Sequence, residues 1–162
     1  MSANIIINPA LQLVGISART TNNEEGGPNG KLPELWNTYF RSSIAERIQA
    51  NNGHLLYGLY TDYESDASGA YTALLGHERG DAEHPIPEDL KLVSVPEAHY
   101  MVFKTKKGPV QEVVLQAWQE IWSLFEHSAI KRAYTGDFEL YDTRNFNPND
   151  AEAEIYIAVH PV

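Results

Sequence analysis

Two stretches of the chain repeat apolar residues at the spacing of an amphipathic helix. In the first, residues 32–48, apolar side chains recur every three to four positions and so share one side of a helix. Pro33 suits a first helical turn, and the polar, glycine-containing run 51–53 supplies a stop. The second stretch, residues 109–127, has the same spacing. The pattern therefore predicts two long helices.

Short runs rich in Tyr, Val, Ile or Leu and bounded by Gly, Asn, Asp or Pro occupy much of the remaining chain, and such runs are typical of strands. The predicted strands are 12–20, 54–61, 69–76, 90–95 continuing past Pro96 into 98–105, 137–142 and 152–160. Segments 21–30 and 80–89 are polar and lack periodicity, which indicates loops.

The order of these elements repeats along the chain as strand, helix, strand, strand. Local sequence supports the repeat, since Leu35-Trp36-x-x-Tyr39 in the first helix resembles Ile121-Trp122-x-x-Phe125 in the second. We therefore predict a single α+β domain over 1–162, with halves at about 11–77 and 90–160. Two pseudo-symmetric halves of this kind form an antiparallel sheet with both helices on one face.

Composition narrows the chemistry. The 162 residues include no cysteine, which excludes disulfides, thiolate nucleophiles and cysteine-based zinc sites. The six histidines lie far apart, so we expect neither a metal site nor a cofactor. Aromatic residues are plentiful, with nine Tyr, five Phe and three Trp.

Charge and hydropathy narrow the partners. The net charge of −10 disfavours nucleic acid and anionic membranes and favours cationic partners. No apolar run approaches the roughly 20 residues that cross a bilayer, and the first residues lack the basic region of a signal peptide. We expect a cytoplasmic protein, either monomer or homodimer, whose partner is a small organic molecule.

Alternation along two strands suggests where that molecule binds. In 137–142, Glu139 and Tyr141 share a face opposite Phe138, and in 152–160 Tyr156 lies opposite an aliphatic face. We expect Tyr156 to lie on the same face as Glu139 and Tyr141. A desolvated carboxylate among aromatic rings suits a ligand that brings positive charge, although solvent-facing strands also show this pattern.

Several stretches together resemble the GyrI-like family of effector-binding domains. They are Val14-Gly15-Ile16-Ser17-Ala18-Arg19-Thr20; Leu35-Trp36 with Tyr39-Phe40; Tyr57-Gly58-Leu59-Tyr60-Thr61-Asp62-Tyr63; and Trp118-x-x-Ile121-Trp122-x-x-Phe125 with Tyr134-x-x-Asp137-Phe138-Glu139-Leu140-Tyr141 and Glu154-Ile155-Tyr156-Ile157-Ala158-Val159. The resemblance implies an aromatic pocket between two pseudo-symmetric halves, with an acidic residue at the position of Glu139. In relatives, the effector-binding domain often follows a DNA-binding domain in the same chain. No helix-turn-helix pattern precedes the matching stretches, so we expect a stand-alone member without direct nucleic-acid binding.

The candidate ligand-binding residues combine the carboxylate of Glu139 with aromatic rings from both halves. They are Glu139, Tyr141, Tyr156, Trp122, Tyr60, Tyr71 and Trp36. Trp36 and Trp118 lie within their helical stripes, which favours core packing for both.

We expect a protein that binds hydrophobic, cationic, drug-like molecules. Two alternative functions stay open. In a hydrolase of reactive electrophiles, Glu139 is the general acid or base and Tyr141 or Trp122 orients the substrate. In a protein-interaction module, the tyrosine face contacts a protein partner.

Overall fold

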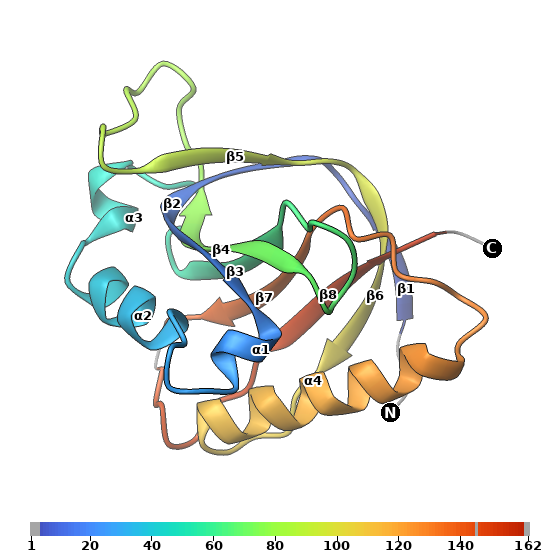
Figure 1. Cartoon of the computed structure of the whole chain (residues 1–162). Coiled ribbons are helices and arrows are strands. Elements are labelled where there is room, and N and C mark those ends of the chain that lie inside the picture. Colours follow the sequence, from blue (N-terminus) through green and yellow to red (C-terminus); the bar gives the residue numbers. More distant parts are fainter. Residues whose placement is uncertain (1–3, 145, 161–162) are drawn as a thin grey trace.

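The computed structural model describes residues 4–144 and 146–160, and it is an α+β fold built on one antiparallel sheet (Figure 1). Its strands are β1 (Asn4–Asn8), β2 (Leu11–Thr21), β3 (Leu55–Thr61), β4 (Ala70–Glu78), β5 (Lys91–Val95), β6 (Ala98–Lys104), β7 (Asp137–Asp142) and β8 (Glu154–Val159). Its helices are α1 (Asn22–Glu25), α2 (Leu32–Phe40), α3 (Ile44–Arg47) and α4 (Val110–His127). No helix in the described part is both long and apolar enough to cross a membrane.

The strand order shows the predicted duplication. The sheet runs β1-β6-β8-β7-β3-β4-β2-β5, so that β2-α2-β3-β4 and β6-α4-β7-β8 are equivalent halves. The equivalent strands β3 and β7 pair with each other at the centre, with Gly58 opposite Glu139. This pairing places the middle of the sheet, where the halves meet, between the two long helices. The predicted fold of two pseudo-symmetric halves is confirmed.

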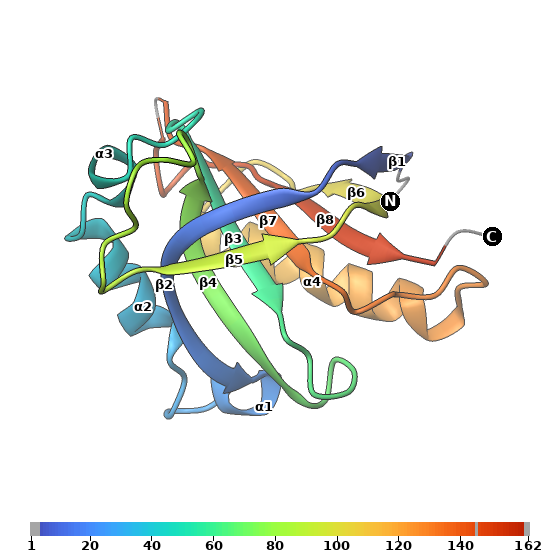
Figure 2. The ribbon, with the colours of Figure 1, turned by 90° about the horizontal axis from the view of Figure 1, so that it is seen from above.

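The outer strands bring the two ends of the sheet together. β1 continues into β2 and β5 continues into β6, and these two long bent strands pair with each other in one register. The pair Asn8↔Ala98 is followed three residues on by Leu11↔Val95. The sheet therefore curls strongly, as Figure 2 shows from above. Its inner face encloses a core of buried residues that includes Tyr57, Leu59 and Phe138.

The opposite face of the sheet carries both long helices, as predicted. Leu35 of α2 packs against Tyr71, Ala73 and Leu75 of β4. On the other half, Ala117, Trp118 and Ile121 of α4 pack against the β8 residues Ile155 and Ile157. Each helix turns its apolar stripe toward the sheet, although Phe40 at the end of α2 is 65% exposed. The short helix α1 lies between α2 and α4 (Figure 1).

Three local predictions were wrong. The stretch 32–48 is two helices rather than one, because the chain turns at Ser43, whose φ is +53°. The Ser42 hydroxyl donates to the Tyr39 carbonyl at 2.7 Å, which competes with continued helix formation. The turn lets Ile44 pack on Val14 of β2.

The second error concerns the polar segment 21–30, which contains the short helix α1. The Thr21 side chain accepts a hydrogen bond from the Glu24 backbone N–H and so caps the start of this helix.

The third error concerns strand β1, which the sequence reading omitted. Its run of three isoleucines has high β propensity, and the whole strand pairs with β6 from Asn4↔Val102 to Asn8↔Ala98. The run meets the criteria of the other predicted strands, since it is rich in Ile and is bounded by Asn and Pro. All three isoleucines are exposed, which is consistent with their place at one edge of the sheet.

Candidate functional site

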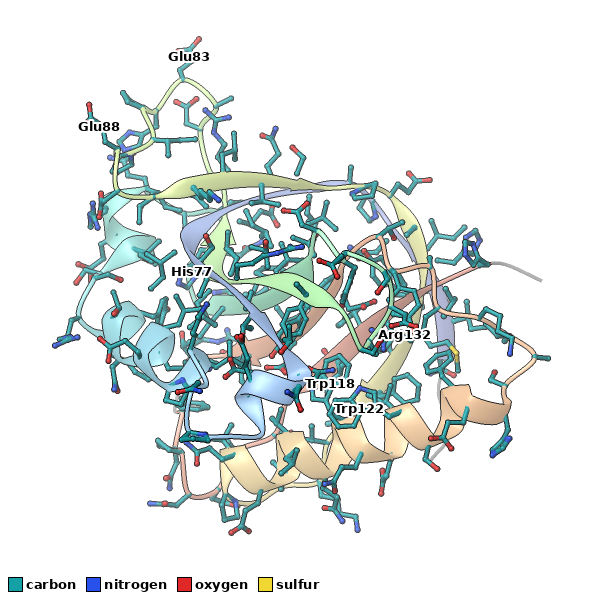
Figure 3. The ribbon with its side chains drawn as sticks, in the orientation of Figure 1. His77, Glu83, Glu88, Trp118, Trp122 and Arg132 are labelled. Atoms are coloured by element: carbon teal, nitrogen blue, oxygen red, sulfur yellow. The ribbon has the colours of Figure 1, made fainter. Side chains whose placement is uncertain are left out.

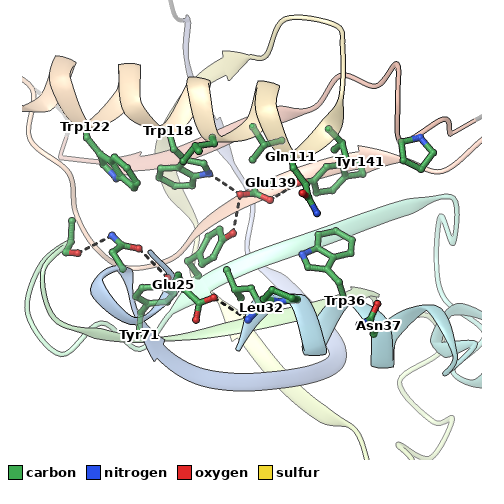
Figure 4. Close-up of a pocket in the computed structure, with 18 of the residues that line it drawn as sticks. Glu25, Leu32, Trp36, Asn37, Tyr71, Gln111, Trp118, Trp122, Glu139 and Tyr141 are labelled. Atoms are coloured by element: carbon green, nitrogen blue, oxygen red, sulfur yellow. Dashed lines mark hydrogen bonds between the residues drawn. The ribbon is translucent and has the colours of Figure 1, made fainter. Parts of the chain in front are cut away.

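A cavity of about 570 Å³ lies on the helix-bearing face where the two halves meet. Residues of α4 form one side, α1 and α2 form the other, and β3, β4 and β7 form the floor (Figure 4). Its size falls in the range of small-molecule sites, roughly 300–1,000 Å³. Six of the seven predicted residues line it, namely Trp36, Tyr60, Tyr71, Trp122, Glu139 and Tyr141.

Strand alternation places the polar centre of this cavity. Glu139 and Tyr141 are two residues apart on β7 and therefore project from the same face. Directly paired residues of antiparallel strands also share a face, so the pair Tyr60↔Asp137 places Tyr60 of β3 beside them. Tyr71 of β4 completes this surface, with its ring centroid 5.6 Å from that of Tyr60.

Glu139 is buried, with 3% of its surface exposed, and three neutral groups donate to its carboxylate. The Tyr60 hydroxyl and the Trp118 indole N–H donate to Oε2 at 2.9 and 2.7 Å. The Tyr141 hydroxyl donates to Oε1 at 2.5 Å. Within residues 4–144 and 146–160, no Lys, Arg or His forms an ion pair with it. The cavity thus contains a buried carboxylate stabilised by hydrogen bonds alone.

Burial sets the protonation of these groups. Desolvation raises the pKa of Glu139 above its ordinary value, and the hydrogen bonds from Tyr141, Trp118 and Tyr60 offset part of that rise. The pKa values of Tyr60 and Tyr141 are raised well above 10, first by burial and then by the negative charge of Glu139. Both hydroxyls therefore keep their protons at neutral pH and remain donors to the carboxylate.

An ion pair between Arg132 and Asp137 forms a second polar group at the cavity. Asp137 is fully buried, and its Oδ2 accepts from Arg132 Nη2 at 2.7 Å and from the Tyr63 hydroxyl at 2.6 Å. Its Oδ1 accepts from the Ala158 backbone N–H at 2.7 Å. Arg132 lines the cavity, and its guanidinium carbon lies 4.5 Å from the Tyr134 ring centroid.

The sequence reading did not select this pair. Asp137 precedes Glu139 by two residues, so strand alternation alone places it on the same face, and that signal was available. Arg132 lies in the segment between α4 and β7. Nothing in its local sequence indicates which carboxylate it meets.

The segment between β2 and α2 forms the remaining side of the cavity. Glu25 of α1 accepts hydrogen bonds from the backbone N–H groups of Lys31 and Leu32, at 2.8 and 3.0 Å, and so stabilises the start of α2. The Tyr71 hydroxyl donates to Asn22 Oδ1 at 3.0 Å. These contacts tie the polar segment to the sheet at the edge of the cavity (Figure 4).

The expectation for Tyr156 was wrong. Tyr156 pairs directly with Phe138, so it lies on the face opposite Glu139. Its ring stacks on that of Phe138, with centroids 4.5 Å apart and planes 14° from parallel. Alternation was read correctly within each strand, but the register between β7 and β8 decides which faces coincide.

The expectation of plain core packing for Trp36 and Trp118 also needs correction. Trp118 is buried but donates its indole N–H to Glu139, so it contributes to the polar centre of the cavity. Trp36 lines the cavity, and its ring meets the Tyr141 ring edge-on with centroids 5.6 Å apart. In the described part of the chain, no cluster of three or more His, Asp or Glu side chains is placed to hold a metal ion.

Comparison with known proteins defines the class. The sequence profile of the Cass2 family, described as integron-associated effector binding protein, matches residues 4–159. The chain belongs to this family, and the resemblance to GyrI-like effector-binding domains is confirmed. The Bacillus subtilis (strain 168) protein YobU, which is named as a transcriptional regulator protein, is 31% identical over 149 residues, covering 91% of each chain.

Solved structures agree with this assignment. The integron cassette protein Cass2 from the mobile metagenome of Vibrio cholerae superposes with a TM-score of 0.78 at 31% identity, covering 98% of this chain and 95% of that one. The protein SAV2435, solved bound to tetraphenylphosphonium, has a TM-score of 0.77 at 19% identity over 99% of this chain and 94% of that one. At that identity the second likeness concerns the fold alone.

Proposed function

We propose that this protein binds small hydrophobic cations in the cavity between α2 and α4, as an effector-sensing or sequestering domain. Glu139 supplies the negative charge, and the aromatic side chains supply apolar contact area. One observation carries the proposal, namely that Glu139 is buried at the centre of the cavity without a cationic partner from the described residues.

The free energy of burying a carboxylate supports this assignment. Removing a carboxylate from water is unfavourable unless a positive charge compensates it. The cavity lacks such a charge beside Glu139, since Arg132 is already paired with Asp137. A bound cation removes this imbalance, and the faces of aromatic rings attract the same cation. The protein's net charge of −10 favours the approach of cations.

The hydrogen bonds of Glu139 narrow the class of cation. Three donors from the protein already occupy lone pairs of the carboxylate, which leaves little acceptor capacity for ligand N–H groups. A cation without N–H donors, such as a phosphonium or quaternary ammonium ion, loses no hydrogen bond on entering this site. The tetraphenylphosphonium bound to SAV2435, which has the same fold, is a cation of this type and supports the proposal.

Tryptophan fluorescence tests the proposal directly, because Trp36, Trp118 and Trp122 all line the cavity. We expect tetraphenylphosphonium to quench this emission saturably. Glu139→Gln should weaken its binding about tenfold, the size of a partly desolvated ion or cation–π contact. The neutral aromatic N-phenyl-1-naphthylamine is the matched control and should bind both proteins equally. Equal weakening of both compounds would rule out the electrostatic role of Glu139.

The same samples separate the proposal from its two alternatives. Unchanged ligand recovered after incubation indicates binding without turnover, whereas consumption of an electrophilic analogue by wild type alone favours the hydrolase. No saturable binding of either compound favours the protein-interaction module.

A further inference from the structure

A second cavity, of about 370 Å³, adjoins the one that contains Glu139. Leu56 and Tyr141 both line it, and these two residues pair directly across β3 and β7, so it lies on the same face of the sheet as Glu139. Residues of α2 and α3 form one side, and residues that follow β7 form another. Figure 3 shows a further lining residue, His77, on the side of α2 and α3 and away from Trp118. The second cavity therefore continues the Glu139 cavity along the sheet.

Aromatic rings form the wall between the two cavities. Trp36, Phe40, Tyr141 and Phe146 line both of them. The Trp36 ring centroid lies 5.6 Å from that of Tyr141 and 5.8 Å from that of Phe40. Phe40 is 65% exposed, so the rim that the two cavities share is open to solvent at this residue. A flexible chain can therefore extend from one cavity into the other beside Phe40.

The buried polar group of the second cavity is satisfied within the protein. His77 Nδ1–H donates to the Leu55 carbonyl at 2.8 Å, because a carbonyl oxygen only accepts. Nε2 is then the acceptor, and the Tyr39 hydroxyl donates to it at 2.7 Å. Burial lowers the pKa of His77 below its ordinary value of 6.5, so the ring is neutral at pH 7. An apolar occupant of this cavity thus meets no buried charge and breaks no hydrogen bond.

We propose that the second cavity holds the apolar tail of a ligand whose cationic head lies at Glu139. The ligand class is then an elongated amphiphile, a quaternary ammonium head with an alkyl chain, rather than a compact cation alone. The side chains of Leu56 and Ile44 and the shared aromatic rings supply the contact area for the chain. This inference rests on the proposed function and adds to it a place for the part of the ligand that Glu139 does not attract.

A series of alkyl-trimethylammonium ions separates head from tail. The hexyl, decyl and tetradecyl compounds share one head group and differ in chain length alone. We expect affinity for wild type to rise roughly threefold for each CH₂ added between hexyl and decyl, because each group leaves water on binding. Isothermal titration calorimetry below the micelle concentration gives each dissociation constant.

Two substitutions fill the second cavity from different sides. Ala45→Phe adds a ring from α3, and Thr143→Phe adds one from the segment after β7; neither residue lines the Glu139 cavity. Thr143 is exposed, so its replacement should not overpack the core. Each variant should bind the decyl compound at least tenfold more weakly and should bind tetraphenylphosphonium and the hexyl compound within twofold of wild type.

Ala82→Phe is the matched control for both variants. Ala82 is an exposed loop residue that lines neither cavity, so this variant should bind every compound as wild type does. A decyl affinity that is the same in Ala45→Phe, Thr143→Phe and Ala82→Phe would show that the chain lies elsewhere.

The outcomes separate this inference from the proposed function. Binding of tetraphenylphosphonium to wild type without a rise in affinity along the alkyl series overturns the role of the second cavity alone. Failure of tetraphenylphosphonium and of all three alkyl compounds to bind wild type overturns the role of the second cavity and the cation-binding function together.

Discussion

Gly58 on β3 lies directly opposite Glu139 on β7, and a Cβ atom at Gly58 would lie 3.4 Å from Glu139 Oε1. The same Cβ would lie 3.7 Å from Leu75 Cδ2. A glycine at this position leaves space beside the buried carboxylate at the line where the two halves of the sheet meet. The central strand pair thus provides both the charge and the room around it.

Substitution at Gly58 should test that space. Gly58→Ala places its methyl group at an ordinary contact distance and should change cation affinity less than threefold. Gly58→Val extends further carbon atoms toward Oε1 and should lower the affinity for tetraphenylphosphonium tenfold or more, with overpacking costing about 1 to 3 kcal/mol of stability. Tryptophan quenching and urea denaturation measure the two effects. Equal affinity in both variants would contradict the proposed position of the ligand.

The affinity for cations should depend on the protonation of Glu139. Its pKa is raised above its ordinary value of 4.5, chiefly by burial, and only the ionised form attracts a cation. Affinity should therefore be full at pH well above the raised pKa. It should fall as pH decreases through that value, by at most roughly tenfold per pH unit for one proton. Titrations from pH 8 to pH 4.5 should show this fall in wild type and a flat profile in Glu139→Gln.

The stability of the ligand-free protein should show the opposite trend with pH. Because its pKa is raised, Glu139 binds a proton more tightly in the folded state than in the unfolded chain. Wild type should therefore gain stability relative to Glu139→Gln as pH falls from the raised pKa toward 4.5. Urea denaturation of both proteins at several pH values measures the difference. A difference independent of pH would mean that the pKa of Glu139 is not raised.

The tyrosine donors should support cation binding through Glu139. Tyr141→Phe and Tyr60→Phe each remove one hydrogen bond to the carboxylate, which raises its pKa further and favours the neutral acid. Each should lower tetraphenylphosphonium affinity about threefold to tenfold near pH 6, with a smaller effect at pH 8. Tyr156→Phe is the matched control, because Tyr156 lies on the opposite face and should leave the affinity unchanged.

Removing one partner of the buried Arg132–Asp137 ion pair should lower the stability of the protein strongly, whereas removing both should lower it much less. Arg132→Met leaves Asp137 buried without its cation and should lower the free energy of unfolding by about 3 to 5 kcal/mol. Arg132→Met/Asp137→Asn removes the unpaired charge and should recover most of that loss. Denaturation midpoints of the two variants check this, and equal destabilisation would show that the charge of Asp137 is not the cause.

Local pattern was sufficient for several parts of the protein. The apolar spacing of 109–127 predicted α4 within one residue, since a helix shows its period in a short window. The repeated order of elements predicted the two halves, and alternation placed Glu139 and Tyr141 together on one face of β7. Apolar spacing alone does not reveal the turn at Ser43, because the apolar stripe continues past this residue while the helix ends and the chain changes direction there.

The remaining features depend on contacts between residues distant in the sequence. Alternation assigns a side chain to one of two faces within its own strand, but the register between strands decides which faces coincide. That register places Tyr156 on Phe138 rather than beside Glu139. Long-range packing also turns the Trp118 indole to Glu139 and brings Arg132 to Asp137. Local pattern thus predicted most of the strands and helices and the face that carries Glu139. The donors around Glu139 could not be predicted in this way, because their contacts form only when strands and helices distant in the sequence pack together.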